Sequence, residues 1–238
     1  MFSDVKLARM TRHNGVLVPA PARSDVVSLQ AQMLTKPNHI SYPPAKTRSV
    51  IFEASVTLDG FIEGPNGEMD WLSRETPESL EGGALFAEFD TMFFGRKAYE
   101  KIALPPLPIS QMTEEQRQFF YMMYAMRKYV FSRHSRHVEG NGMVISNNVD
   151  DEVRRICRED GKNILFCGGA DIFDTFARLD LIDEYVFVVH PVVLRKGKRL
   201  VRDNRSLPAL SLIEKQVLTS GVMIMRYRPT NRIKATGI

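Results

Sequence analysis

The sequence contains only two cysteines, one tryptophan and no long hydrophobic run. Cys157 and Cys167 are too few for a disulfide scaffold, and they lack the histidine or cysteine neighbours of a zinc site, so we expect reduced thiols and no bound metal. No stretch of about 18 apolar residues is present, which excludes a transmembrane helix, and the N-terminus lacks the pattern of a secretory signal. These absences predict a cytoplasmic protein without a membrane partner.

The net charge of +4 raises the possibility of a nucleic-acid partner. Residues 1–47 carry six basic and two acidic side chains, which accounts for this charge, and the rest of the chain is neutral overall. A general nucleic-acid binder is therefore not expected. We interpret this proline-containing segment as an N-terminal arm, either flexible or draped over a partner, with a short helix opening at Ser24 and Asp25. An organelle-targeting peptide is the less fitting alternative, because the segment contains Asp4, Asp25 and several prolines.

From Val50 onward, short apolar strands alternate with amphipathic helices, which is typical of an α/β sheet with crossover helices. Thr113 and Gln116 have the spacing of a capping box and mark a helix start. The segments on either side of Ser220 and Gly221 predict an antiparallel hairpin. We therefore predict one α/β domain with a mostly parallel sheet over residues 48–230 and a short tail over residues 231–238. The expected strands are 50–58, 91–94, 129–131, 143–146, 163–167, 184–189, 210–218 and 222–227, and the expected helices follow Pro77, begin near Thr113, and cover 150–159 and 171–179.

Three of these strands are followed by residues suited to bind the phosphates of a dinucleotide. The carboxyl ends of strands line the ligand crevice of an open α/β sheet, so the three segments could converge. Glycine lets the backbone approach a ligand closely, the first N–H groups of a helix attract anions, and arginine offers a planar fork of donors. Each segment alone could equally be an ordinary turn with solvated charges. The segments are Gly95, Arg96 and Lys97; Ser132 and Arg133; and Gly168, Gly169, Ala170 and Asp171.

Together these segments resemble the dihydrofolate-reductase-like family, in the branch that contains the reductase domain of riboflavin biosynthesis. The resemblance covers about residues 48–230, and its motifs occur in the family's order at similar spacing. They are SVTLDGFIEG, DWL, FFGRKAYE, YVFSR, ILFCGGADIF and LIDEYVFVVHPVVLRKGKRL. The resemblance implies a dihydrofolate-reductase-like fold, NADPH as the cofactor and a homodimer.

The resemblance also implies roles for single residues. The adenosine end of NADPH and its extra ribose phosphate would contact Gly95, Arg96, Ser132 and Arg133, with Lys97 beside them. The pyrophosphate and the nicotinamide side would contact Gly168, Gly169, Ala170, Asp171 and Ile172, with a cis bond between the two glycines.

Two further residues are candidates for the catalytic site. They lie in a loop that resembles the segment bordering the nicotinamide and the substrate in the family. Asp59 is the candidate catalytic carboxylate. An equally good interpretation is that Asp59 is a turn residue whose side chain caps the backbone. Trp71 could cover the substrate or fill the core. Glu78 and Glu81 fall near the position where folate-reducing relatives place a substrate-binding acid.

Three departures from the family pattern concern the cofactor and the substrate. Ala98 stands where the family commonly has threonine, which removes one hydroxyl donor to phosphate. Cys167 stands where riboflavin-pathway reductases often have glutamate, which argues against folate or riboflavin intermediates as substrates. Arg195 and Lys196 replace a glycine and change the rim of the pocket. A deaminase partner domain is not expected, because its zinc-site motif is absent.

The prediction is therefore an NADPH-dependent reductase that transfers hydride to a C=N or C=O bond of a small molecule. The alternative is a non-catalytic nucleotide-binding or regulatory module on the same fold, because fold alone does not establish activity. A second alternative is a nucleic-acid binder that uses the basic arm.

Overall fold

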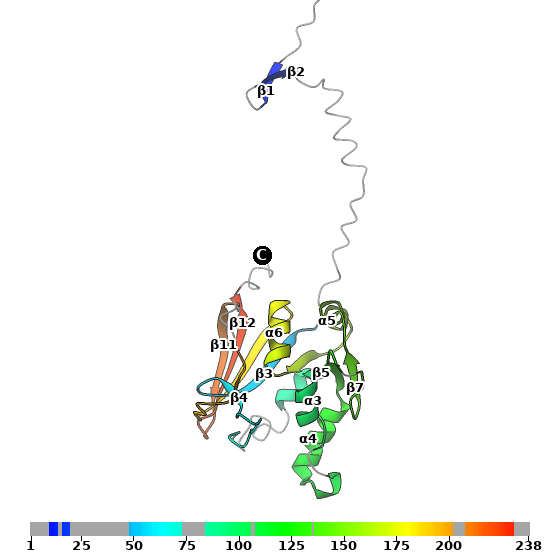
Figure 1. The fold of residues 1–238 in the computed structure, drawn as a ribbon, viewed down its shortest axis with the longest axis vertical. Coiled ribbons are helices and arrows are strands. Elements are labelled where there is room, and N and C mark those ends of the chain that lie inside the picture. Colours follow the sequence, from blue (N-terminus) through cyan, green and yellow to red (C-terminus); the bar gives the residue numbers. More distant parts are fainter. Residues whose placement is uncertain are drawn as a thin grey trace, which may run out of the picture. The chain divides into compact units, whose positions relative to one another are not determined.

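The computed structural model describes residues 10–13, 16–19, 48–72, 84–105, 108–134, 136–201 and 208–230. The chain divides into two compact units, residues 1–43 and 44–238. In the first unit, β1 (Met10–His13) pairs antiparallel with β2 (Val16–Pro19) (Figure 1). These strands are not among the elements expected from the sequence. The helices expected near Ser24 and after Pro77 lie outside the described residues, as do Glu78 and Glu81.

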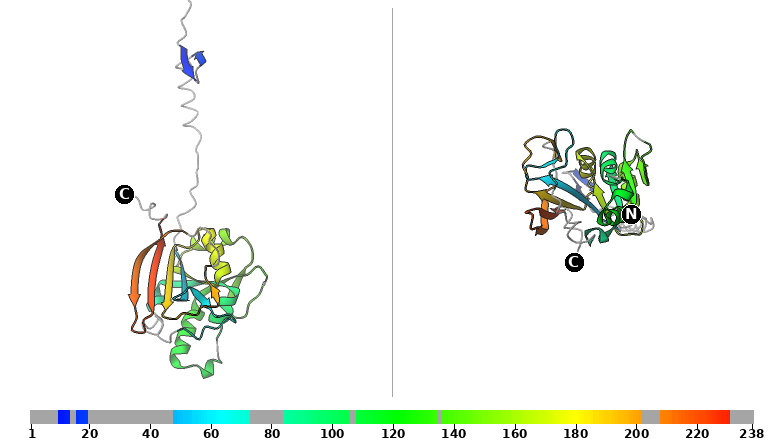
Figure 2. Two further views of the ribbon diagram at one scale, coloured as in Figure 1. Left: turned by 60° about the vertical axis from the view of Figure 1, so that its left-hand side comes forward. Right: turned by 90° about the horizontal axis from the view of Figure 1, so that it is seen from below.

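The second unit is built on an 8-stranded sheet in the order β11-β12-β9-β3-β8-β5-β6-β7. The strands from β9 to β7 are parallel, β12 is antiparallel to β9, and β11 is antiparallel to β12. Figure 2 shows this C-terminal hairpin, in orange and red, at one side of the sheet. The predicted mostly parallel sheet with an antiparallel hairpin is confirmed. The strands are β3 (Val50–Thr57), β5 (Phe89–Gly95), β6 (Arg127–Phe131), β7 (Gly142–Ile145), β8 (Asn163–Cys167), β9 (Glu184–His190), β11 (Leu210–Val217) and β12 (Met223–Pro229).

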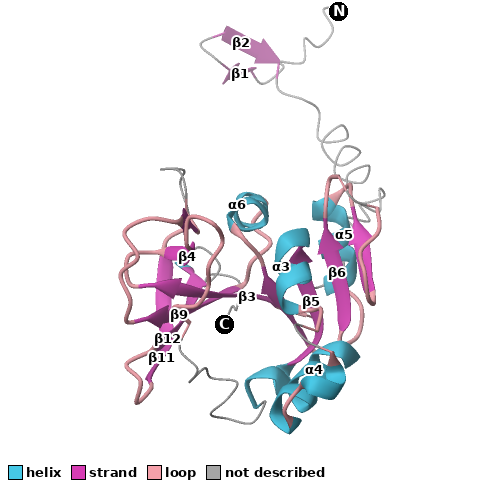
Figure 3. Ribbon diagram, turned by 60° about the horizontal axis from the view of Figure 1, so that its bottom comes forward, coloured by secondary structure: helices cyan, strands magenta, loops and turns pink. Residues whose placement is uncertain are grey.

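Helices cover both faces of the sheet (Figure 3). On one face, α5 (Val149–Cys157) and α6 (Ala170–Arg178) bury Ile156 and Phe176 against alternate residues of the strands. On the other face, α3 (Arg96–Ile102) and α4 (Glu114–Ala125) bury Tyr99 and Met123 in a second apolar cluster. Thr113 caps α4 in the predicted capping box with Gln116. The short 3-10 helices are η1 (Ala84–Glu88) and η2 (Ile109–Gln111).

The second unit also contains a small two-stranded sheet that the sequence pattern does not predict. β4 (Phe61–Glu63) pairs antiparallel with β10 (Lys198–Arg199). Glu63 accepts hydrogen bonds from the amino groups of Lys198 (2.5 Å) and Lys101 (3.1 Å). These strands are too short to show an alternating pattern, and their partners lie far apart in the chain, so only the tertiary structure defines them.

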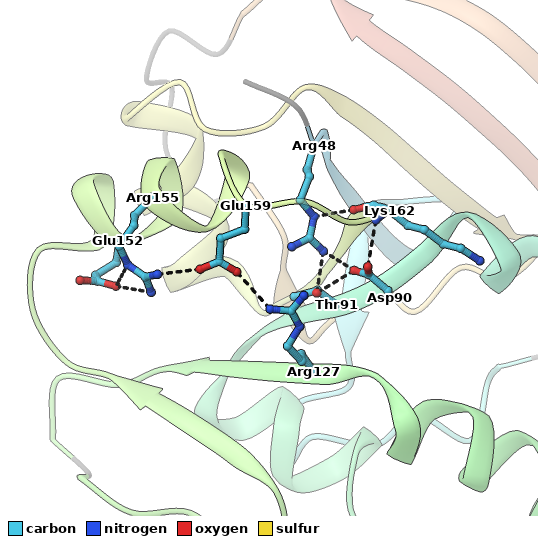
Figure 4. Close-up of polar contacts among 8 residues, drawn as sticks. All are labelled: Arg48, Asp90, Thr91, Arg127, Glu152, Arg155, Glu159 and Lys162. Carbon is cyan, nitrogen blue, oxygen red and sulfur yellow. Dashed lines mark hydrogen bonds and ion pairs between the residues drawn. The ribbon is translucent and has the colours of Figure 1, made fainter. Parts of the chain in front are cut away.

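At the amino end of the sheet, buried Arg48 joins three segments (Figure 4). Its Nε donates to the carbonyl oxygen of Lys162 (2.6 Å) and its Nη2 to Oγ1 of Thr91 (2.6 Å), and the same nitrogen forms an ion pair with Asp90. Burial favours the protonated form of Asp90, but hydrogen bonds from Lys162 and Thr91 and the charge of Arg48 outweigh it and lower the pKa of this carboxyl. Arg48 therefore ties the start of the second unit to β5 and to the turn before β8.

A second buried cation, Lys128, secures the end of α4 against the sheet. Its Nζ donates to the carbonyl oxygens of Met123 (2.6 Å), Tyr124 (3.1 Å) and Met126 (3.0 Å), which belong to the end of that helix. A cation at a helix C-terminus satisfies free carbonyl groups and complements the helix dipole. Burial lowers the pKa of the Lys128 amino group to about 8.

Candidate functional site

The three predicted phosphate-binding segments lie at neighbouring strand ends. β8, β5 and β6 are adjacent in the sheet, with Phe94 in register with Cys167 and Gly95 in register with Phe131. Gly95 therefore lies beside the start of the Ser132–Arg133 segment, and Gly168 follows the strand on its other side. The predicted convergence at the carboxyl edge of the sheet is confirmed.

The first glycine of the pair at 168 and 169 is required by packing. A Cβ atom at Gly168 would lie 2.5 Å from Cγ2 of Ile172 and 2.8 Å from Cε2 of Phe166, and a Cβ atom at Gly95 would lie 2.9 Å from the same Cγ2. At Gly169 a Cβ atom would meet nothing within 4 Å. Packing therefore excludes a larger residue at position 168 but not at position 169. The expected cis bond is wrong, because the described residues contain no cis peptide bond.

The paired glycines lead directly into α6. Gly169 is the N-cap residue, Ala170 is the first residue of the helix and is buried, and Asp171 lies exposed in the first turn. Asp171 is therefore not the cap of this helix, which begins one residue before it. A carboxylate in the first turn stabilises the helix through its dipole.

The basic residues of the site are mostly exposed. Nη1 of Arg96 donates to both carboxylate oxygens of Glu100, at 2.7 and 3.0 Å, one turn along α3. Lys97 and Arg133 are exposed, whereas Ser132 is half-buried and its backbone N–H donates to the carbonyl oxygen of Ile145 (3.0 Å). Arg133 therefore presents its charge to solvent, and Arg96 would have to leave Glu100 to reach a phosphate.

Asp59 caps the backbone of a neighbouring loop. Its carboxylate accepts hydrogen bonds from the hydroxyl of Thr57 (2.7 Å) and from the backbone N–H groups of Leu194 (3.2 Å) and Arg195 (2.8 Å). Desolvation opposes ionisation, but these hydrogen bonds prevail and lower the pKa of the Asp59 carboxyl. They also fix Arg195 in a left-handed conformation with φ of 63°. This geometry matches the turn-capping interpretation.

Trp71 lies against His190, the last residue of β9. The two rings are edge-to-face, with centroids 5.4 Å apart, and His190 is fully buried. The indole Nε1 of Trp71 is buried with no hydrogen-bond partner. Trp71 therefore lies at the carboxyl end of β9, where His190 is in register with Thr57 of β3.

A cavity of about 230 Å³ lies on the α3 and α4 side of the sheet, and among the described residues it reaches the predicted cofactor segments only through Cys167. Cys167, directly before the paired glycines, contributes to its wall, and so does Ile102 at the end of α3. Its lining is mostly apolar, as in typical small-molecule sites. The lining residues are Ile51, Glu53, Phe86, Glu88, Phe89, Met92, Ile102, Phe119, Met123, Leu165, Cys167, Val186, Glu214, Gln216, Ile224 and Arg226.

The polar residues of this cavity are not among the site residues predicted from the sequence. Glu53 is in register with Cys167, and its Oε2 lies 3.9 Å from the Cys167 sulfur. Arg226 donates to both carboxylate oxygens of Glu88, at 3.3 and 3.2 Å, and also pairs with Glu184. One signal was available for Glu53, because it is a charged residue within a strand that is otherwise largely apolar.

Two observations concern membrane-spanning helices and metal sites, neither of which is expected from the sequence. None of the helices in the described part of the chain is long and apolar enough to cross a membrane. The described ranges also contain no group of three or more histidine, cysteine, aspartate or glutamate side chains arranged to bind a metal ion.

Known proteins resemble this chain in sequence and in fold. Residues 48–224 match the RibD C-terminal domain. The uncharacterized protein YyaP of Bacillus subtilis is 32% identical over 182 residues, which cover 76% of this chain and 95% of YyaP. A putative riboflavin biosynthesis protein from Shewanella sp. PV-4 superposes with a TM-score of 0.60 and 21% identity, covering 76% of this chain and 98% of the other. Dihydrofolate reductase from Enterococcus faecalis, complexed with NADP(H) and RAB-propyl, superposes with a TM-score of 0.53 and 12% identity, covering 76% and 96%. The predicted dihydrofolate-reductase-like fold is confirmed.

Proposed function

Because this chain belongs to the RibD C-terminal domain family, a reductase family, we propose that it is an NADPH-dependent reductase acting on a C=N or C=O bond of a small molecule. The observation that carries the proposal is the meeting of three strand ends beside an apolar cavity of about 230 Å³. The strand ends supply glycine, arginine and serine for the cofactor, and the cavity has room for a small ring.

The residues at the strand ends fit a dinucleotide. The open space beside Gly169 lets a ligand approach the backbone and the first turn of α6, where N–H groups favour a pyrophosphate. Ser132 and Arg133 would bind the ribose phosphate at the adenosine end, and Arg96 would join them after leaving Glu100. NADPH, when bound, supplies the hydride.

The chain's own residues position the substrate and exclude water. The apolar side chains of Met92, Met123 and Leu165 form much of the cavity wall. Trp71 packs over the end of β9, where it would shield the reacting atoms from solvent. Asp59 would act on this site by fixing the 194–195 backbone.

The alternative, a nucleotide-binding module without catalysis, draws support from Asp59, whose carboxylate accepts three hydrogen bonds from Thr57, Leu194 and Arg195. The deciding experiment has two stages. Titration with NADPH and NADH, followed by intrinsic fluorescence, tests cofactor binding. Loss of nicotinamide absorbance with pterins, pyrimidinones and quinones then tests turnover. Tight NADPH binding without turnover of any compound would favour the module, and absence of NADPH binding would refute both proposals.

A further inference from the structure

Two arginines at the carboxyl edge of the sheet differ in how far their charge is neutralised. Nη1 of Arg96 donates to both carboxylate oxygens of Glu100, at 2.7 and 3.0 Å. Both side chains of this pair are partly exposed, 38% for Arg96 and 45% for Glu100. Arg133 is exposed and forms no ion pair with any residue that the structure describes. The charge of Arg133 is therefore available to an anion, whereas Glu100 neutralises much of the charge of Arg96.

Arg96 and Arg133 leave neighbouring strands at the same level of the sheet. Arg96 is the first residue of α3 and follows Gly95, the last residue of β5. Gly95 is in register with Phe131, which comes directly before Ser132 and Arg133. At this edge α3 lies against β5 and β6 (Figure 3). The arrangement suits a single phosphate group that meets both arginines.

The order of the Arg96–Glu100 pair argues against a purely structural role. An ion pair four residues apart stabilises a helix more when the acid precedes the base, because the acid then lies toward the positive end of the helix dipole. Asp174 and Arg178 on α6 follow this order. Arg96 and Glu100 have the reverse order, and an exposed pair contributes little to stability in any case. The main effect of the pair is therefore on the charge that Arg96 offers to a ligand.

We propose that Glu100 lowers the preference for NADPH over NADH, because its carboxylate competes with the ribose phosphate of NADPH for Arg96. This inference rests on the proposed function for the identity of the cofactor. A phosphate monoester carries a charge of about −1.5 to −2 at pH 7, more than a single carboxylate, so it displaces Glu100. Glu100 then keeps an unpaired negative charge one turn along α3, which repels the phosphate. NADH leaves the ion pair intact, and Glu100 is thus a positioning residue that acts through Arg96.

The isosteric variant Glu100→Gln of the full chain tests the proposal. NADPH should bind about threefold to tenfold more tightly, because the carboxylate no longer competes or repels, and NADH should bind almost as before. Adenosine 2′,5′-bisphosphate, which carries the ribose phosphate but no nicotinamide, should gain affinity by the same factor, and AMP should not. Calorimetric titration measures all four ligands. An unchanged or lower ratio of NADPH to NADH affinity would overturn the proposal.

A double-mutant cycle shows whether Glu100 acts through Arg96. In the wild-type chain, Arg96→Ala should weaken NADPH binding at most about threefold, because Arg96 must first leave Glu100. In the Glu100→Gln chain, the same substitution should weaken it about tenfold or more, since the guanidinium is then free to bind the phosphate. Additive effects of the two substitutions would refute the competition.

Glu159→Gln is the matched control. Glu159 pairs with Arg155 at the same spacing and in the same order, at 2.6 Å, and it also pairs with Arg127 at the start of β6, at the amino edge of the sheet (Figure 4). This variant should leave the affinities for all four ligands unchanged. A gain in NADPH affinity equal to that of Glu100→Gln would reflect net charge alone and contradict the role of Glu100.

Three further outcomes distinguish this inference from the proposed function. Equal losses of NADPH and NADH affinity in Glu100→Gln, with lower stability in urea, would make the pair structural and refute the inference. A higher bisphosphate affinity in Glu100→Gln without turnover of any substrate would support the inference and count against the reductase alone. Turnover with NADPH and unchanged affinities in Glu100→Gln would refute only the inference. A wild-type chain that binds neither NADPH nor the bisphosphate would refute both proposals.

Discussion

Gly168 packs so tightly against Ile172 that a Cβ atom on the glycine would lie 2.5 Å from Cγ2 of the isoleucine. The loop after β8 and the first turn of α6 are thus in direct contact. We predict that Gly168→Ala displaces this loop, lowers the free energy of unfolding by about 1 to 3 kcal/mol and weakens NADPH binding. Gly169→Ala is the control for stability, because a Cβ atom there meets nothing within 4 Å. Urea unfolding and cofactor titration measure both effects, and equal stability of the two variants would contradict the prediction.

The second prediction concerns Arg133 and the choice between NADPH and NADH. NADPH carries a ribose phosphate that NADH lacks, and a charge-assisted hydrogen bond to it contributes about 1.5 to 3 kcal/mol, or about a tenfold to hundredfold effect on affinity. We predict that Arg133→Ala weakens NADPH binding by this factor and leaves NADH binding nearly unchanged. Arg178→Ala, at the last turn of α6, provides a control for the loss of an exposed charge. Parallel losses for both cofactors would refute the assignment of Arg133.

Much of the fold could be predicted because its signals are local. The strand at 163–167 matches β8 to the residue, and the other predicted strands end within two residues of the observed ones. These segments are apolar runs bounded by turn residues, so their limits follow from nearby sequence. The N-terminal strands also had a local signal, since Asn14-Gly15 is typical of two-residue hairpins. That signal was missed.

The site could be predicted only in part, because some of its contacts join distant segments. The glycine and arginine segments follow strands that are recognisable one by one, and parallel strands bring their ends together. The role of Asp59 depends on Leu194, 135 residues further along the chain, which no local pattern shows. The cavity likewise combines residues from distant segments. Glu53 lies on β3 and Glu214 on β11, so no pattern in the sequence connects these two lining residues.

The N-terminal arm, residues 1–47, should be dispensable for folding, whereas Arg48 should not be. Deletion of residues 1–47 is expected to leave the free energy of unfolding of the second unit unchanged. Arg48→Ala in that shortened chain should destabilise it by about 2 to 3 kcal/mol, since a buried cation is lost and partly exposed Asp90 loses its partner. The exposed pair Arg154–Asp150 is the control, and Arg154→Ala should cost at most about 1 kcal/mol. An insoluble product after deletion of residues 1–47 would show that the arm is part of the fold.

Homodimer formation remains a proposal, supported by the edge strand β11. Leu212, Ile213 and Val217 on this strand are exposed, with 67% of Val217 accessible. An exposed edge strand with apolar side chains is prone to pair with another chain. We expect light scattering at micromolar concentration to give the mass of a dimer and Val217→Glu to shift it toward the monomer. A monomeric wild-type chain would refute the proposal.

The last prediction concerns pH and Lys128. The pKa of its amino group is about 8 in the folded chain, below the ordinary value of 10.5. Between these values the unfolded chain binds more protons than the folded chain, so the free energy of unfolding increases as pH rises through this window. Below about pH 8 both states are protonated, so the full cost of burying the charge is present throughout this lower pH range. Lys128→Met removes the titrating group, so the stability of the wild type relative to this variant should increase by about 1 to 2 kcal/mol between roughly pH 7 and pH 9.5.

Urea unfolding of both chains at the two pH values measures the difference. Lys215→Met, which removes an exposed amine from β11, gives the contribution of a surface charge. A difference that stays constant with pH would show that Lys128 is charged throughout this range, and one that decreases would reverse the assigned direction of the pKa change.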